Sequence, residues 1–131
     1  MSSRFPISEM PDPSIATQID VAVHELHGEN PPFQWKDSNG SFLGLYGPLS
    51  HSPIVTPAFW GMGRAMTHPD SIKRQNYELA LLGLFSVIDA PYPRYCHRLL
   101  AKENGITDEQ YDCGLQGTIP NGLSHAGVSK T

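Results

Sequence analysis

Glu78 is the residue whose type and surroundings most favour chemistry. It falls in a predicted helix, and the residues at the next helical spacings on its face are all apolar: Leu81, Leu82 and Phe85. An ionised carboxylate on such a face is costly unless it is paired. Burial therefore favours the protonated form and makes Glu78 a candidate proton donor near neutral pH. A structural role is the alternative, in which Glu78 pairs with a nearby cation: Arg74, Arg94 or Arg98.

His97 and Tyr92 are the candidates to act with Glu78. Both lie in the stretch APYPRYCHRLLA at residues 90–101, where prolines precede a predicted helix. Apolar residues at the helical spacings after His97 place its ring on the core side, where it can meet the helix of Glu78. Titratable groups that project into apolar packing from neighbouring helices are a common source of a catalytic acid and base. Tyr92 could add a phenol as a third proton donor, and ordinary core packing is the alternative for both residues.

Cys96 stands beside His97, as a nucleophile beside its base would. Consecutive residues of a helix do not face each other, however, so we expect Cys96 to be a buried, small apolar residue. Cys96 and Cys113 match no zinc or CxxC spacing, which favours a reducing compartment, with a bridge between the two as the alternative. His24 and His27 lie one helical turn apart without a third ligand at a suitable spacing. We therefore expect no metal site and no cofactor.

The composition narrows the class of partner. The chain has 131 residues and a net charge of −4, and its nine Lys and Arg form no basic run. We therefore expect no nucleic-acid partner. No window approaches the roughly eighteen consecutive apolar residues of a membrane span, and the N-terminus has no signal-peptide core. These features favour a cytoplasmic protein without a membrane contact.

Apolar periodicity and capping signals position the helices that must hold these residues. Thr107 and Gln110 form a capping-box pattern, while Gly28 and Asn104-Gly105 are typical of helix ends. Ser52 is expected to cap a helix in which Pro53 is the first residue, with a start one turn later, at Pro57, as the alternative. The predicted helices, in order, are residues 14–27, 53–66, 71–90, 93–103 and 108–115. The third is apolar on nearly every side in its second half and is expected to be the central, buried helix.

The remaining segments are predicted to be irregular. Residues 29–53 are rich in proline and glycine, and residues 117–131 carry no helical pattern. Because no alternating strand pattern is visible, we expect a compact all-α fold with a long irregular N-terminal half. Within a single globular unit, residues 1–37 form an N-terminal helix and irregular arm, and residues 38–131 form a helical domain.

The order of these residues resembles the carboxymuconolactone decarboxylase-like and alkyl hydroperoxidase D-like family. The matching pattern is YELALL at residues 77–82, then Tyr92, His97, Ala101 and GITDEQYD at residues 105–112. Glu78 stands nineteen residues before His97, which is the separation that this family uses. Weaker agreement upstream, at Gly40, Gly47-Pro48 and Ser52-Pro53, extends the likeness over residues 38–117.

The resemblance implies a helical fold that assembles into trimers or hexamers through an oligomeric core, with active sites near the subunit contacts. The redox branch of the family carries a cysteine pair at positions that are Ala90 and Pro93 here, so disulfide-cycling chemistry loses its nucleophile. The decarboxylase branch needs no cysteine: a lactone bearing a carboxylate loses carbon dioxide while a proton is delivered to carbon. Glu78, His97 and Tyr92 would share that work.

Three functions remain open at this point. The favoured one is a non-redox acid/base enzyme, a lyase or isomerase that acts on a small carboxylated or lactone substrate. The second is a thiol peroxidase, with peroxiredoxin-type activity, that uses Cys96 as its nucleophile. The third is a truncated, non-catalytic subunit of a homo-oligomer, because relatives of the decarboxylase type continue with further helices.

Overall fold

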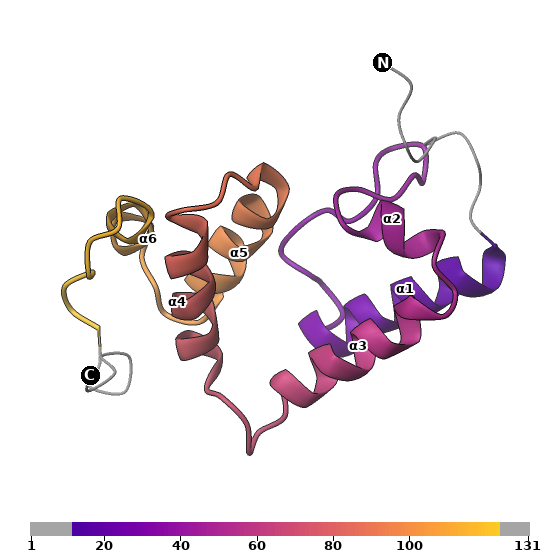
Figure 1. Cartoon of the computed structure of the whole chain (residues 1–131), viewed down its shortest axis with the longest axis horizontal. Coiled ribbons are helices and arrows are strands. Elements are labelled where there is room, and N and C mark those ends of the chain that lie inside the picture. Colours follow the sequence, from indigo (N-terminus) through magenta and orange to yellow (C-terminus); the bar gives the residue numbers. More distant parts are fainter. Residues whose placement is uncertain (1–11, 124–131) are drawn as a thin grey trace. The chain divides into compact units, whose positions relative to one another are not determined.

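The computed structural model describes residues 12–123. Every regular element in this range is an α-helix, and one isolated bridge joins Lys36 to Phe42. The prediction of an all-α protein is therefore confirmed for the described residues. The chain divides into two compact units between His68 and Pro69, and each unit contains three helices (Figure 1). A domain boundary between residues 37 and 38 stays a prediction.

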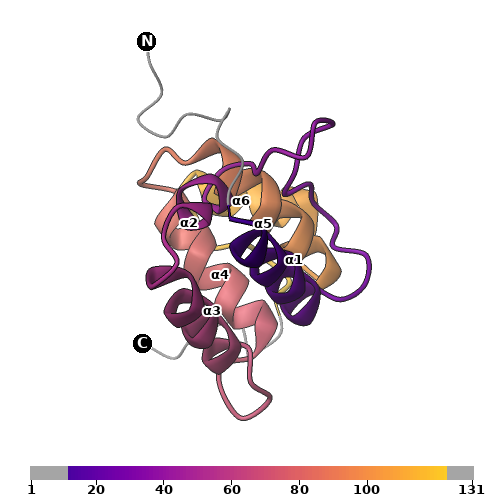
Figure 2. The same cartoon turned by 90° about the vertical axis from the view of Figure 1, so that its right-hand side faces the viewer.

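The first unit is built from three helices: α1 (Pro13–His27), α2 (Tyr46–Ser50) and α3 (Val55–Met66). Asp12 caps α1, because its carboxylate accepts a hydrogen bond from the Ser14 amide at 2.7 Å. Gly28 ends the helix with a φ of 84°, a conformation that glycine adopts at little cost. The predicted helix over residues 14–27 is thus confirmed. Helices α1 and α3 run beside each other in both views (Figure 2).

Two predictions for this unit are wrong. The stretch over residues 29–53 is not irregular throughout, since it contains the short helix α2. In addition, α3 begins at Val55, and its first turn has no side-chain cap. Ser52 does not cap the helix because its hydroxyl donates to the Pro48 carbonyl at 3.3 Å. The Ser52 side chain, which was expected to cap the start of α3, therefore bonds to a carbonyl of α2 instead.

The second unit is also built from three helices: α4 (Arg74–Phe85), α5 (Pro91–Glu103) and α6 (Asp108–Leu115). Helix α4 contacts both of the others. The predicted capping box is confirmed, since the Gln110 amide donates to the Thr107 hydroxyl at 3.2 Å and the Thr107 amide donates to the Gln110 side chain at 2.9 Å. The predicted tail has no helix as far as residue 123, and its remainder lies outside the described residues. No helix in residues 12–123 has the length and apolar character needed to cross a bilayer.

The helix predicted over residues 71–90 is shorter at both ends. It stops at Phe85 because the Arg94 guanidinium donates to the carbonyls of Phe85 and Ile88, each at 2.7 Å, and so satisfies groups that the helix leaves open. It is also not buried on every side, since Leu84 is 47% exposed. Helix α4 therefore presents one buried face to the rest of its unit.

Close packing between α4 and α6 sets the position of that buried face. The core cluster of the unit is formed by Leu82, Ala101, Ile106 and Tyr111. A Cβ atom on Gly114 would lie 2.4 Å from Cδ2 of Leu82, well inside the contact distance. Only a glycine at this position of α6 lets α4 approach so closely. Glu78, one turn before Leu82, is carried into the interior with it.

Candidate active site

Glu78 is one of the most deeply buried residues of the described chain. Its exposed fraction is 1%, and it shares the buried face of α4 with Leu82 and Phe85. The burial of Glu78, predicted from the apolar residues at helical spacing after it, is therefore confirmed. A carboxylate in such a place needs a partner, because transfer of an unpaired charge out of water is strongly unfavourable.

His97 is that partner. Nδ1 of His97 and Oε2 of Glu78 are 2.8 Å apart and share a hydrogen bond between α5 and α4. The Glu78 side chain is 0% exposed, whereas that of His97 is 22% exposed, so the imidazole is the outer member of the pair. With Nδ1 engaged by Glu78, Nε2 is the nitrogen that can meet a ligand or solvent. A pair of this kind holds a proton inside the fold and offers an exchange point near the surface.

Glu78 does not pair with any of the three arginines that the structural alternative offered. Arg74 lies over the ring of Tyr77, with 6.0 Å between the guanidinium carbon and the ring centroid. Arg94 caps the end of α4, and Arg98 binds two aspartates of α6. The second carboxylate oxygen of Glu78, Oε1, is buried and has no hydrogen-bond partner. Among residues 12–123, the imidazole of His97 is therefore the one side chain that forms a hydrogen bond or ion pair with this carboxylate.

Two aromatic rings lie beside His97. The centroid of the His97 ring lies 5.7 Å from that of Phe85 and 6.3 Å from that of Tyr77. Burial raises the pKa of Tyr77, the Glu78 carboxylate raises it further, and Arg74 opposes the shift. The phenol of Tyr77 therefore stays protonated at neutral pH. Sequence reasoning missed Tyr77 as part of the site, although its position directly before Glu78 was a signal.

Tyr111 is a second aromatic residue that the sequence did not single out. It is 2% exposed, and burial raises its pKa to about 12, with Arg98 opposing the shift and the nearby Glu78 adding to it. Its hydroxyl donates to the Arg94 carbonyl at 3.3 Å, and the Arg98 guanidinium carbon lies 4.8 Å from its ring centroid. Tyr111 thus helps to exclude water from the carboxylate side of the pair. The sequence signals for it were its place in the segment GITDEQYD and the capping box that starts α6.

Tyr92 and Cys96 lie one turn apart on α5 and interact with each other. Burial raises the pKa of Cys96 to about 11, although a hydrogen bond with the Tyr92 side chain offsets part of the increase. Cys96 is 6% exposed, in agreement with its prediction as a buried, small apolar residue. The Tyr92 ring also lies 6.1 Å from that of Tyr95. The role of Tyr92 as a proton donor to the Glu78–His97 pair stays a prediction.

The other histidines considered as ligands have different surroundings. Nδ1 of His24 lies 2.7 Å from the Asp20 carbonyl oxygen, and its ring meets Trp35 edge-on. The ring of His27 meets Phe33 edge-on. Within residues 12–123, no group of three or more His, Cys, Asp or Glu side chains is placed to hold a metal ion.

The chemistry open to the Glu78–His97 pair is proton transfer. A buried carboxylate can set the orientation of an imidazole and stabilise its protonated form, while Nε2 exchanges a proton with a bound molecule. Comparisons of the chain with protein-family models, with curated proteins and with solved structures found no match.

Proposed function

We propose that this protein is a non-redox acid/base enzyme that decarboxylates or isomerises a small lactone bearing a carboxylate. The observation that carries the proposal is the 2.8 Å contact between Oε2 of the buried Glu78 and Nδ1 of His97, which lies beside the rings of Tyr77 and Phe85. A purely structural ion pair could use an arginine and bond both carboxylate oxygens. Here the partner is the titratable His97, and Oε1 of Glu78 has no hydrogen-bond partner. Proton transfer makes use of both features.

In the proposed reaction, the substrate carboxylate leaves as carbon dioxide. Its C–C bond breaks, and the electron pair passes into the conjugated lactone carbonyl as an enolate. Nε2–H of the protonated His97 then delivers a proton to carbon, and the imidazole regains a proton from solvent through its exposed edge. Glu78 remains ionised throughout and stabilises the imidazolium. Tyr92, if its phenol reaches the substrate, supplies a further hydrogen bond to the lactone.

The resemblance to the carboxymuconolactone decarboxylase-like family supports this choice of substrate class. The two residues nineteen positions apart on which it rests are the two that form the hydrogen bond. Membership of that family, a trimeric or hexameric assembly and a cytoplasmic location belong to the proposal as well. The thiol-peroxidase alternative is disfavoured, because a cysteine with a pKa of about 11 is almost entirely protonated at neutral pH and only the thiolate is nucleophilic.

The test uses five-membered unsaturated lactones that carry a carboxylate, incubated with the protein in D2O. NMR would follow carbon dioxide release and the appearance of a new carbon–deuterium bond. We expect the full-length protein to turn over at least one lactone, and Glu78→Gln and His97→Gln to lower the rate by about 100-fold or more, the usual range for a general acid or base. Glu103→Gln, on an exposed site of the same helix α5, is the matched control and should leave the rate unchanged.

Two outcomes would contradict the proposal. One is the absence of turnover with every lactone of the panel. The other is wild-type rates in both Glu78→Gln and His97→Gln, with circular dichroism confirming that the variants are folded.

A further inference from the structure

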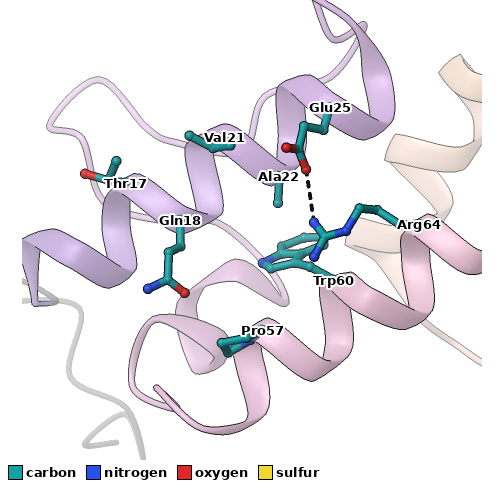
Figure 3. A pocket seen from close by; sticks show the side chains of 8 residues that line it. All are labelled: Thr17, Gln18, Val21, Ala22, Glu25, Pro57, Trp60 and Arg64. Atoms are coloured by element: carbon teal, nitrogen blue, oxygen red, sulfur yellow. Dashed lines mark hydrogen bonds and ion pairs between the residues drawn. The ribbon is translucent and has the colours of Figure 1, made fainter.

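A hollow of about 230 Å³ lies in the first unit between α1 and α3, and neither Glu78 nor His97 belongs to its lining. Figure 3 shows the indole of Trp60 among the lining side chains, with Thr17, Gln18 and Val21 on α1 above it. The volume suits one small ring with substituents, since a protein cavity of about 150 Å³ is enough for benzene.

The indole nitrogen of Trp60 is the unusual feature of this hollow. Trp60 is 5% exposed, and its Nε1–H is buried without a hydrogen-bond acceptor. Tryptophan can only donate at this atom, and a buried donor without an acceptor costs free energy. The other tryptophan, Trp35, shows the usual solution, because its Nε1 donates to Asp20 at 2.9 Å. Trp60 is therefore a donor that a ligand can satisfy.

The walls of the hollow indicate the polarity of that ligand. Val21, Ala22 and Pro57 make much of the lining apolar. The charged residues at the edge are already paired, since Nη1 of Arg64 donates to Oε2 of Glu25 at 3.0 Å. Neither charge is left over to attract an ion. A neutral molecule with an apolar body and one acceptor matches these groups.

We propose that this hollow binds a small, neutral, mainly apolar molecule with a ring and one carbonyl group, and that the carbonyl oxygen accepts a hydrogen bond from Nε1 of Trp60. The nitrogen has almost no exposed surface in the unliganded structure, so a neighbouring side chain must move as the ligand enters. Gln18 is exposed and lies on the nitrogen side of the indole in Figure 3. Rotation of such a side chain on binding is common.

The test is an NMR titration of the full-length, ¹⁵N-labelled protein with two probes of nearly equal shape. Acetophenone carries the carbonyl oxygen, and α-methylstyrene has a CH2 group in its place. We expect acetophenone to shift the Trp60 indole N–H resonance downfield and saturably, while the Trp35 resonance, which already has its acceptor, stays in place. α-Methylstyrene should bind at least tenfold more weakly.

Two variants sharpen the test. Val21→Phe fills the hollow from a residue that is 51% exposed, so it should abolish the acetophenone shift without unfolding the unit. Trp60→Phe should make the two probes bind equally, as followed by the methyl resonances of Ala22. If Trp60→Phe does not fold, the comparison of acetophenone with α-methylstyrene on the wild-type protein still tests the proposal. Equal binding of both probes to the wild-type protein, an equal shift at Trp35, or no shift at all would overturn the proposal.

Discussion

The two units of this protein treat buried polar groups differently. In the first unit, the buried side chains of Ser50 and Thr56 are neutral, and each donates to a backbone carbonyl at 2.6 Å. In the second unit, the buried polar group is Glu78, whose single partner is the titratable ring of His97. A neutral hydroxyl bonded to the backbone fixes local structure and holds no exchangeable charge. The comparison teaches that similar three-helix units can bury neutral, backbone-bonded hydroxyls in one case and a carboxylate bonded to an imidazole in the other.

The two units also differ in the contacts that pack their cores. Stacked rings fill much of the first core, with centroid distances of 6.5 Å between Phe33 and Tyr46 and 5.9 Å between Tyr46 and Trp60. The second core brings α6 against α4 at Gly114, where no side chain fits. Ring stacking therefore contributes much of the first core, whereas the close approach of two helices at a glycine contributes to the second.

The largest expected effect separates the two kinds of buried polar group. His97→Ala leaves Glu78 buried without a partner and should lower the stability of the second unit by about 3 kcal/mol, near the low end of the range for a broken buried pair. Thr56→Val removes one neutral hydrogen bond and should cost the first unit only about 1 kcal/mol. Hydrogen exchange of the core amides of each unit measures both values.

A double variant isolates the cause of that effect. Glu78→Leu combined with His97→Leu removes the unpaired charge together with its partner and should recover most of the lost stability, as apolar replacements of buried pairs often do. Equal losses in His97→Ala and Thr56→Val would break the comparison between the units. Such a result would mean that Glu78 carries no uncompensated charge when its partner is removed.

The second effect concerns the two glycine contacts between helices. Gly114→Ala should destabilise the second unit by about 2 kcal/mol, because its new Cβ would lie 2.4 Å from Cδ2 of Leu82 in a closed core. In the first unit, a Cβ on Gly63 would lie 3.3 Å from Cδ1 of the half-buried Leu26, which can move aside. Gly63→Ala is therefore expected to be close to neutral. Thermal unfolding of the two variants measures the difference.

Gly83→Ala is the control for helix propensity in this experiment. Gly83 lies on α4 with no atom near its Cβ position, so the substitution should stabilise the helix by about 0.5–1 kcal/mol. If Gly114→Ala were to stabilise the protein as Gly83→Ala does, the close approach of α6 to α4 would be wrong.

The smallest effect concerns the thiol beside the candidate active site. In a Cys113→Ser background, alkylation of Cys96 by iodoacetamide should keep rising about tenfold per pH unit until the pH nears 11, whereas an ordinary thiol levels off near pH 9. Because the folded-state pKa is raised, the stability from the protonated thiol is present below pH 9 and is lost as the pH rises toward 11.

The variant Tyr92→Phe tests the cause assigned to the pKa of Cys96. Tyr92→Phe removes the hydrogen bond that lowers the pKa of Cys96, so alkylation at pH 9 should slow by roughly threefold. A rate that levels off near pH 9 in the parent protein, or faster alkylation in Tyr92→Phe, would contradict the described environment. Fast alkylation at neutral pH would also return the thiol-peroxidase alternative to consideration.

Local signals predicted those elements whose ends depend on residues close in sequence. Helix α1 ends at Gly28, and α6 begins at the Thr107 capping box, as their short motifs indicated. The C-terminal end of α4 depends on Arg94, which lies nine residues beyond Phe85 and donates to its carbonyl. A window of helical periodicity contains no information on such a contact, so the predicted helix over residues 71–90 ran too far.

The candidate site divides in the same way. The apolar spacing after Glu78 predicted its burial, and the apolar spacing after His97 predicted that the ring faces the core. The choice between His97 and the arginines as the partner of Glu78 stayed open, because periodicity gives the face of a helix and not the distance across to the next one. Tyr111 stood in the segment GITDEQYD, but its approach to the pair could not be predicted, because it depends on how α6 packs against α4 and α5.

By itself, the sequence of this protein determined its all-α class, the helix ends at residues 27, 66 and 103, both ends of the helix over residues 108–115, and the residues that turn inward. These features depend on backbone propensity and on the burial of apolar side chains. Tertiary structure alone decided which charge meets which: it gave Arg94 to the end of α4, Arg98 to α6 and His97 to Glu78. The physical reason is that a charged partner is selected by the distance and orientation between packed helices, at a scale of a few ångströms that no residue spacing encodes.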